Sequence, residues 1–176
     1  MITRAFCFVV LCIASNGVVI GQSIEITGHD VEQSVNGAET DIYCNDGDTL
    51  TVAGFLDVTN NAGEAVKCKV KYRIVPDGET PHPWVYQLND AGTGHKLYDI
   101  PEGETSPAVA VLESATVPDP ATQDFIKFEF MLEFYEVGVG GEEIGVQLGE
   151  DTIGFDFWWC GAPTTEPGGE ENGEGL

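Results

Sequence analysis

The sequence predicts an all-β fold, an antiparallel β-sandwich of the immunoglobulin-like or a similar type, with a β-barrel as the alternative. Ten segments rich in Val, Ile, Phe, Tyr and Thr are separated by turn-forming residues at short intervals. Two of these segments alternate clearly between apolar and polar residues. No window keeps a helical apolar period over three turns. Many short strands at this spacing are typical of sandwiches and barrels.

The predicted strands follow one another along most of the chain, and each ends at a turn sequence. The turns carry Gly, Pro, Asn and Asp, as in 45–48, 60–63 and 76–78, and these residues accept or preset the backbone angles of turns. We expect the second, third and fourth strands to form a meander of neighbours in one sheet. The predicted strands are 23–27, 40–44, 49–58, 65–75, 84–88, 95–100, 107–116, 125–137, 142–148 and 152–159.

Alternation assigns a core face to the strands 65–75, 125–137 and 152–159. Side chains along a strand point to opposite faces in turn, so every second residue shares a face. Trp158 is thereby placed outward. The predicted core positions are Val66, Cys68, Val70, Tyr72, Ile74, Ile126, Phe128, Phe130, Leu132, Phe134, Phe155, Phe157 and Trp159.

Residues 1–21 have the composition of a secretory signal peptide. Arg4 precedes an apolar run that ends at Ala14, and small residues follow up to Gly21, the preferred cleavage point, with Gly17 as the alternative. The apolar run is shorter than the about 20 residues that span a bilayer, so we expect cleavage rather than a membrane anchor. The chain is therefore predicted to be secreted and extracellular, with no membrane span.

Two further regions follow the signal peptide. Residues 22–160 are predicted to form a single β-sandwich domain, and the about 155 residues of the mature chain suffice for one core. Residues 161–176 are rich in Gly and Glu and contain no aromatic or basic residue. Such a segment buries too little apolar surface to offset the entropy lost on ordering, so we expect a disordered acidic tail.

The charge of the chain is strongly negative. It has 7 basic and 30 acidic residues, and loss of Arg4 with the signal peptide changes the formal net charge from −23 to −24. A field this negative repels nucleic acid and anionic lipid surfaces, so we expect no nucleic-acid partner. It favours cations, basic proteins and calcium-rich surfaces. Solubility or adaptation to high salt is the alternative explanation.

The cysteine count points to one disulfide. Five Cys become three when Cys7 and Cys12 leave with the signal peptide, and an odd count in a secreted protein leaves one thiol over. In a meander, Cys44 and Cys68 lie farther apart than the about 4.4–6.8 Å between Cα atoms that a disulfide allows. We therefore predict a Cys44–Cys160 bridge with Cys68 as a buried free thiol. The odd cysteine also allows a disulfide-linked dimer.

Four of the six remaining basic residues share one face of the strand 65–75. Such a stripe could bind an anionic ligand, for example a sulfated glycan or a phosphate. It could instead pair with acidic residues of a neighbouring strand, such as Glu129 and Glu133, and each pair would contribute roughly 0.2–1 kcal/mol. We favour pairing because acidic residues are so abundant. The stripe consists of Lys67, Lys69, Lys71 and Arg73.

Acidic residues gather around one turn and in the tail. Carboxylate oxygens are suitable ligands for Ca²⁺. Residues 45–48 do not fit an EF-hand loop, because Ile42 would then be the first ligand, and a hairpin turn is the better interpretation. We expect weak, diffuse calcium or mineral contact rather than a calcium cage. The candidate residues are Asp41, Asp46, Asp48, Glu166, Glu170, Glu171 and Glu174.

No catalytic or cofactor motif is present. His29, His82 and His95 lack the spacing of metal ligands. The chain has no nucleophile elbow, zinc-protease, Walker or dinucleotide-binding fingerprint. We therefore predict a protein that is not an enzyme and has no cofactor apart from weakly bound Ca²⁺.

One set of residues resembles a known family. Cys44, the strand Thr49 to Val58 and the final segment 157–160, which reads Phe-Trp-Trp-Cys, follow a signal peptide in the order seen in the MD-2-related lipid-recognition family. The resemblance covers about a third of the chain and implies a secreted β-sandwich that holds lipid between its sheets. The family's additional cysteine pairs are absent from this sequence.

These observations favour a secreted, acidic structural protein of an extracellular or biomineral matrix, such as a shell or skeleton. Its partners would be matrix components or a mineral surface. The alternative is a secreted β-sandwich that binds a lipid or an anionic glycan. A hollow between the sheets, lined by Phe130, Phe134 and Phe157, would favour the alternative, whereas a filled core would favour the matrix protein. A secreted hydrolase is a third hypothesis, for which no site is visible.

Overall fold

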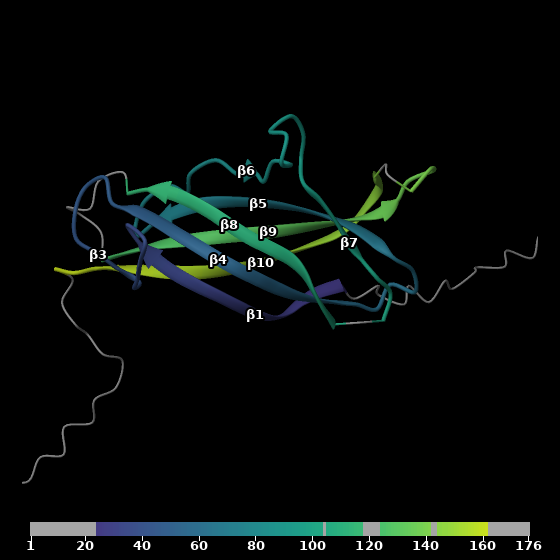
Figure 1. The fold of residues 1–176 in the computed structure, drawn as a ribbon, viewed down its shortest axis with the longest axis horizontal. Coiled ribbons are helices and arrows are strands. Elements are labelled where there is room, and N and C mark those ends of the chain that lie inside the picture. The colour runs from purple at the N-terminus through teal and green to yellow at the C-terminus, as the bar shows by residue number, and fades with distance from the viewer. Residues whose placement is uncertain (1–23, 104, 118–123, 142–143, 162–176) are drawn as a thin grey trace, which may run out of the picture.

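The computed structural model describes residues 24–103, 105–117, 124–141 and 144–161. These residues form strands in two stacked sheets, and none of them is helical (Figure 1). The predicted all-β sandwich is confirmed. Within the described ranges, no helix is long and apolar enough to cross a membrane. The predicted signal peptide, and the predicted tail after Gly161, lie outside the described residues.

The first sheet, called sheet A here, has four antiparallel strands in the order β2-β1-β4-β8. The predicted strand 23–27 is much longer than expected and continues to Val35, with a bulge between Ile26 and Gly28. At Gly54 the backbone of β1 is so close that a Cβ on residue 54 would lie 2.6 Å from the Val31 Cα. Only glycine fits at this position without displacing β1. The strands are β1 (Ile24–Val35), β2 (Ala38–Glu39), β4 (Thr49–Asn60) and β8 (Thr105–Thr116).

The second sheet, called sheet B here, has the order β3-β10-β9-β5-β6, and β7 also pairs with β5. The predicted segments 142–148 and 152–159 are one long strand, β10, because pairing with β9 continues through Glu150 and Asp151. The strands are β3 (Ile42–Tyr43), β5 (Val66–Pro76), β6 (Val85–Tyr86), β7 (Leu97–Ile100), β9 (Phe125–Val137) and β10 (Ile144–Trp159).

The expected meander of the second to fourth predicted strands is wrong. The chain changes sheets at each of the two turns, because β3 and β5 belong to sheet B while β4 lies between β1 and β8 in sheet A. β3 runs parallel to the end of β10, with Ile42 opposite Trp158 and Tyr43 opposite Trp159. Alternation in a sequence shows which face of a strand is buried, but it does not identify the neighbouring strand.

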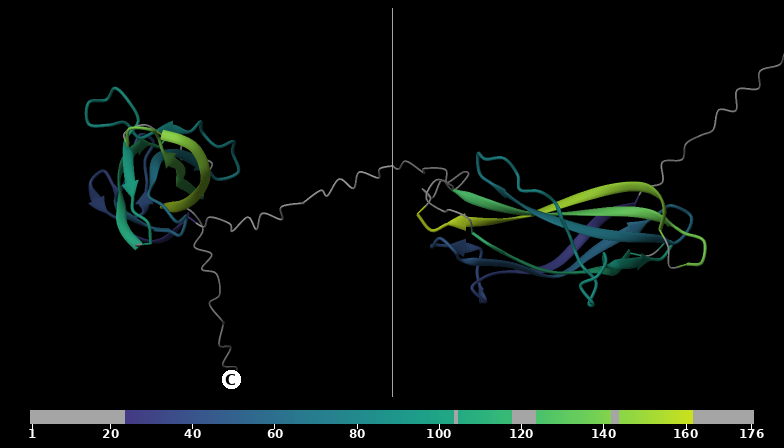
Figure 2. Two further views of the ribbon diagram at one scale, coloured as in Figure 1. Left: turned by 90° about the vertical axis from the view of Figure 1, so that its right-hand side faces the viewer. Right: turned by 90° about the horizontal axis from the view of Figure 1, so that it is seen from above.

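The core fills the space between the two sheets, which curve around it in the end-on view of Figure 2. The predicted core positions of β5, β9 and β10 are buried, except that Tyr72 and Trp159 are half-buried and pack against the core. Trp158 is exposed as predicted. The largest fully buried side chains are Tyr43, Phe128, Phe130, Phe134, Phe157, Leu50, Leu56, Ile100, Ile126 and Leu132.

Candidate functional site: the two outer faces

The basic stripe lies on the outer face of sheet B, where most of its charges are paired. Arg73 lies opposite Glu129, and both Nε and Nη2 of its guanidinium are 2.8 Å from Glu129 Oε2. Lys71 reaches diagonally to Glu133, with 2.6 Å between Nζ and Oε1. The predicted pairing with these two acidic residues is confirmed. Lys67 forms an ion pair with Asp99 of β7, a residue that the sequence did not suggest as its partner.

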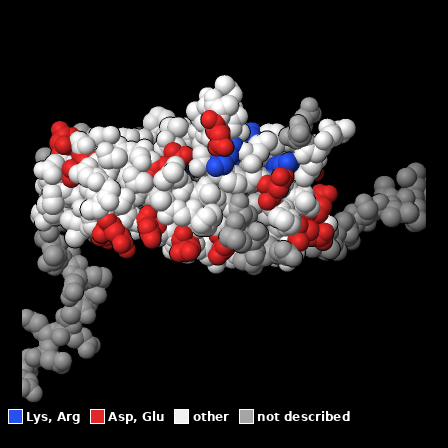
Figure 3. Space-filling model, in the orientation of Figure 1, with Lys and Arg blue, Asp and Glu red and all other residues white. Residues whose placement is uncertain are grey.

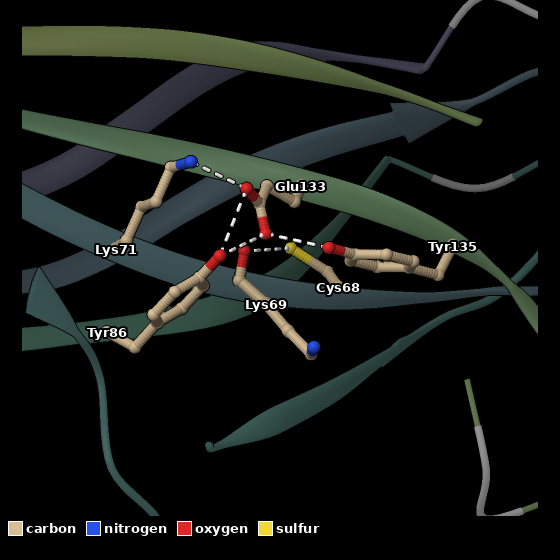
Figure 4. Close-up of polar contacts among 6 residues, drawn as sticks. All are labelled: Cys68, Lys69, Lys71, Tyr86, Glu133 and Tyr135. Carbon is tan, nitrogen blue, oxygen red and sulfur yellow. Dashed lines mark hydrogen bonds and ion pairs between the residues drawn. The ribbon is translucent and has the colours of Figure 1, made fainter. Parts of the chain in front are cut away.

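Glu133 is the centre of this network and is buried (Figure 4). Its carboxylate accepts hydrogen bonds from Lys71, from the Tyr86 hydroxyl at 3.0 Å and from the Tyr135 hydroxyl at 2.8 Å. Burial alone would raise the pKa of Glu133, but these hydrogen bonds outweigh burial and lower it. The carboxylate is therefore held ionised between three strands, β5, β6 and β9, that it fastens together.

Aromatic rings surround the stripe. The Trp84 ring lies beneath the Arg73 guanidinium, with 4.3 Å between Arg73 Cζ and the centroid of the Trp84 ring. The ammonium of Lys69 lies 4.9 Å from the Tyr135 ring centroid and 5.9 Å from that of Tyr86. In the described part of the chain, no carboxylate forms an ion pair with Lys69. Lys69 is thus the stripe residue that contacts ring faces without forming an ion pair among the described residues, although it lies opposite Glu133 across β5 and β9.

The outer face of sheet A has a different composition. Strand register places three cross-strand rows side by side, and neighbours in a row share a face. Asp30, Phe55 and Ala110 form one row. Glu32, Ala53 and Leu112 form the next, and Ser34, Thr51 and Ser114 form the third. Phe55 is 48% exposed and Leu112 is 68% exposed, although both lie in the middle of long strands.

Within the described ranges, the Lys and Arg side chains all lie on one side of the sandwich. Lys67, Lys69, Lys71 and Arg73 lie on β5, Lys127 lies on β9 and Lys96 precedes β7, so all belong to the sheet B side. The strands of sheet A contain no Lys or Arg. In Figure 3, blue basic groups lie only in the upper part, with red acidic groups beside them, and further red groups lie at the left-hand end and along the lower edge.

The candidate cation ligands near the 45–48 turn do not form one site. Asp41 and Asp46 are exposed, but Asp48 is buried. Asp48 accepts hydrogen bonds from the Asn36 side chain and from the backbone N–H groups of Cys44 and Asn45, and these lower its pKa to about 2. Its carboxylate holds the loop between the two sheets, so Asp41 and Asp46 are the exposed candidates near this turn.

The remaining candidate ligands add no metal site that the structure describes. No group of three or more His, Cys, Asp or Glu side chains is arranged to hold a metal ion among the described residues. Residues 45–48 do form a turn, with the Asp48 N–H bonded to the Asn45 carbonyl, but it joins strands of different sheets rather than a hairpin. The tail residues Glu166, Glu170, Glu171 and Glu174 lie outside the described residues.

The predicted disulfide is present. Cys44 and Cys160 directly follow the paired ends of β3 and β10, with 5.3 Å between their Cα atoms. A disulfide is consistent with an extracellular location. Cys68 is a free thiol that is fully buried, and burial raises its pKa. An intermolecular bridge through Cys68 would require the sandwich to open.

The space between the sheets holds closely packed aromatic side chains. Phe130, Phe134 and Phe157 are fully buried. The Phe130 ring stacks on Phe128 at a centroid distance of 5.0 Å and meets the edge of Phe155 at 6.1 Å. This packing supports a filled core at these positions, where the sequence suggested a lipid pocket as one alternative.

One carboxyl group at the border of the core was not singled out from the sequence. Glu113 of β8 lies opposite the buried Val52, so it points toward the inside of the sandwich. Burial raises the pKa of Glu113, although hydrogen bonds with Gln87 and Tyr72 and the charge of Lys96 act in the opposite direction. Its position could be recognised only from the register of β4 and β8.

Comparisons with known proteins add little. No family model and no curated protein matches the chain. Structures of Bacteroides uniformis β-glucuronidase 2 and of a Bacteroides uniformis β-glucuronidase each align with 76% of this chain and 14% of their own, at TM-score 0.44 and at 17% and 14% identity. The Bacillus subtilis sporulation control protein Spo0M aligns at TM-score 0.30 and 11% identity, over 76% of this chain and 50% of its own. At these TM-scores, none of them supports an inference about function.

Proposed function

We propose that the protein is a secreted, acidic structural protein of an extracellular or biomineral matrix, which contacts cations or basic partners through its surface carboxylates. The observation that carries this proposal is the separation of charge between the sheets. Three of the four stripe residues form ion pairs on sheet B. The exposed carboxylates of sheet A, such as Asp30 and Glu32, have no Lys or Arg on their own sheet and remain available to a partner.

The arrangement of carboxylates also supports a role without catalysis. Glu133, a buried carboxylate on the outer side of sheet B, is already hydrogen-bonded by Lys71, Tyr86 and Tyr135. Its lowered pKa keeps it ionised, whereas a general acid or base that works near neutral pH needs a pKa near that pH. We therefore assign the Glu133 network to the stability of sheet B.

Adsorption to cationic surfaces tests the proposal. We expect the mature chain to adsorb to calcium carbonate and to polylysine-coated beads, and the adsorption should weaken as salt is added. Replacing Glu166, Glu170, Glu171 and Glu174 with Gln would separate the contribution of the tail from that of the domain. Absence of adsorption to both surfaces at low salt, together with no heat on titration with millimolar calcium, would show that the proposal is wrong.

A second candidate, an anionic-glycan-binding module, is favoured by one observation. Lys69 has no carboxylate partner among the described residues and lies between the rings of Tyr86 and Tyr135. A sulfate group could approach this ammonium directly. Retention on a heparin column that is lost in Lys69→Gln, but kept in Lys96→Gln, would support this candidate. Elution of the unmodified protein in the flow-through would exclude it.

A further inference from the structure

The outer face of sheet A carries an apolar patch that projects from regular strands rather than from a loop. Phe55 and Leu112 lie diagonally across β4 and β8, with the small residues Ala110 and Ala53 opposite them. Diagonal neighbours on a sheet are about 7–8 Å apart, close enough for large side chains to form one surface. Scattered exposed apolar residues need no explanation, but a contiguous patch typically marks an interaction site.

The edge of the patch along β1 is acidic. Asp30 lies opposite Phe55, and Glu32 lies opposite Ala53, so the two carboxylates follow the patch along one side. Both residues are exposed. A neutral partner covering the patch would remove water from these carboxylates without replacing it. Sheet A of a second copy of this chain would bring further negative charge, because its strands contain no Lys or Arg either.

We propose that this face binds an extended, basic segment of a partner protein, whose apolar side chains cover Phe55 and Leu112 while its Lys or Arg side chains pair with Asp30 and Glu32. Charge complementarity selects this occupant. Residues two apart on a strand are separated by about 6.8 Å, and an extended ligand repeats its side chains at the same interval. The two carboxylates are thus spaced for two successive basic side chains of a strand.

The inference rests on the proposed function and makes it more specific. Contact with mineral or free calcium requires only carboxylates, whereas this face combines carboxylates with apolar surface. The partner is therefore a protein with both basic and apolar side chains, and binding should depend on both kinds of contact. A purely electrostatic interaction would depend on charge alone and would be spread over the whole acidic surface.

Synthetic peptides can test this directly by fluorescence anisotropy. The probe is a labelled peptide of six Lys-Leu repeats, which when extended places successive Lys side chains about 6.8 Å apart on one side and the Leu side chains on the other. The matched peptide has Ser in place of Leu and the same charge. We expect the mature protein to bind the Leu peptide at least tenfold more tightly than the Ser peptide at physiological salt.

Variants of the full mature chain locate the site. The double variant Phe55→Ser/Leu112→Ser should lower affinity for the Leu peptide at least tenfold, and Asp30→Asn/Glu32→Gln should lower it several-fold. The matched control is Val139→Ser/Val146→Ser in the β9–β10 hairpin, where both residues are also exposed. This control should bind like the original protein. Thermal unfolding of each variant verifies that the fold is retained.

The outcomes separate the two proposals. Equal binding of both peptides, or equal loss in the Val139/Val146 control, would overturn the docking face while leaving a general acidic interaction intact. Failure to bind either peptide or a polylysine surface would overturn both. If sedimentation shows a dimer that Phe55→Ser/Leu112→Ser dissociates, the occupant is a second copy, and the basic partner is wrong.

Discussion

The carboxylates of the two sheets differ in what surrounds them. On sheet B, Glu129 and Glu133 lie beside β5, which has four basic residues, and they form ion pairs with Arg73 and Lys71. On sheet A, Asp30 and Glu32 lie beside Phe55 and Ala53, with no Lys or Arg on any strand of the sheet. The same residue type is structural on one side and available on the other, because one strand, β5, carries most of the positive charge.

The difference shows how an acidic protein can keep a stable sheet. In a chain with 30 acidic residues, repulsion between carboxylates acts across both sheets. Sheet B carries most of the few Lys and Arg residues on β5, whereas the outer face of sheet A carries Thr, Ser, Ala and the exposed Phe55 and Leu112 between its acids. Sheet B should therefore depend strongly on individual charged residues, and sheet A should tolerate their loss.

The largest effect is expected at the centre of sheet B. Glu133→Leu leaves the ammonium of Lys71 without its carboxylate and the hydroxyls of Tyr86 and Tyr135 without their acceptor. Loss of one partner from a buried ion pair should lower the free energy of unfolding by about 4 kcal/mol. Urea denaturation followed by tryptophan fluorescence measures this change.

The matched variants for Glu133 distinguish pairing from packing. Glu32→Leu on sheet A should change stability by less than about 0.5 kcal/mol. The double variant Lys71→Met/Glu133→Leu removes both charges and should recover much of the lost stability. If Glu133→Leu and Glu32→Leu have the same effect, the contrast between the two sheets does not exist.

A smaller but still large effect is expected from the disulfide, which attaches β3 to the edge of sheet B. Cys44 and Cys160 are 116 residues apart in sequence, so their bridge restricts the unfolded chain strongly. Cys44→Ser/Cys160→Ser should lower the free energy of unfolding by about 3 kcal/mol. Hydrogen exchange should increase first at Ile42 and Tyr43, while β4 in sheet A remains protected. Uniform exchange in both sheets would contradict this localisation.

Sequence predicted the strands well because their signal is local. The alternation of β5 and β9 and the turns between strands are visible within short windows, and their buried faces are as expected. The pairing of strands depends on residues far apart in the sequence, so the sequence predicts β3 beside β4, whereas the structure pairs β3 with β10. The disulfide prediction is correct, although its premise, the meander, is wrong. Between Cys44 and Cys68 the chain passes through β4 of sheet A before it returns to sheet B.

The candidate sites are harder to predict from the sequence, because they too depend on contacts between residues far apart along the chain. The role of Asp48 depends on Asn36, which lies in another turn and donates to its carboxylate. The patch on sheet A joins Phe55 and Leu112, 57 positions apart along the chain, through the register of β4 and β8. Phe55 and Leu56 are adjacent apolar residues, and only the structure decides that Leu56 is buried and Phe55 is exposed.

Glu113 and Glu133 extend the comparison to pH, because their pKa values shift in opposite directions. The raised pKa of Glu113 means that its ionised form opposes folding, so Glu113→Gln should stabilise the protein at pH 7, by less than about 1 kcal/mol. Below the pKa of about 4.3 of an unfolded-chain Glu, both states are protonated and the gain should disappear.

Glu133→Gln provides the opposite case in the same titration. The lowered pKa of Glu133 means that its contribution is present above the unfolded-chain pKa and is lost as pH falls through the folded pKa. Glu133→Gln should therefore destabilise at pH 7, and the loss should shrink at acidic pH. Denaturation curves between pH 3 and pH 7 measure both differences. Differences of the same sign at pH 7 would mean that the environments of the two groups are not distinct.

The smallest effect on stability is expected on the outer face of sheet A. Asp30→Asn/Glu32→Gln removes two carboxylates that form no ion pair with any described residue, so the free energy of unfolding should change by less than about 0.5 kcal/mol. Any change should be a gain at low salt, since the variant relieves repulsion in a highly negative protein, and it should vanish as salt screens the charges. A loss of stability that persists in high salt would mean that these carboxylates hold sheet A together as Glu133 holds sheet B, and they would then be unavailable to a partner.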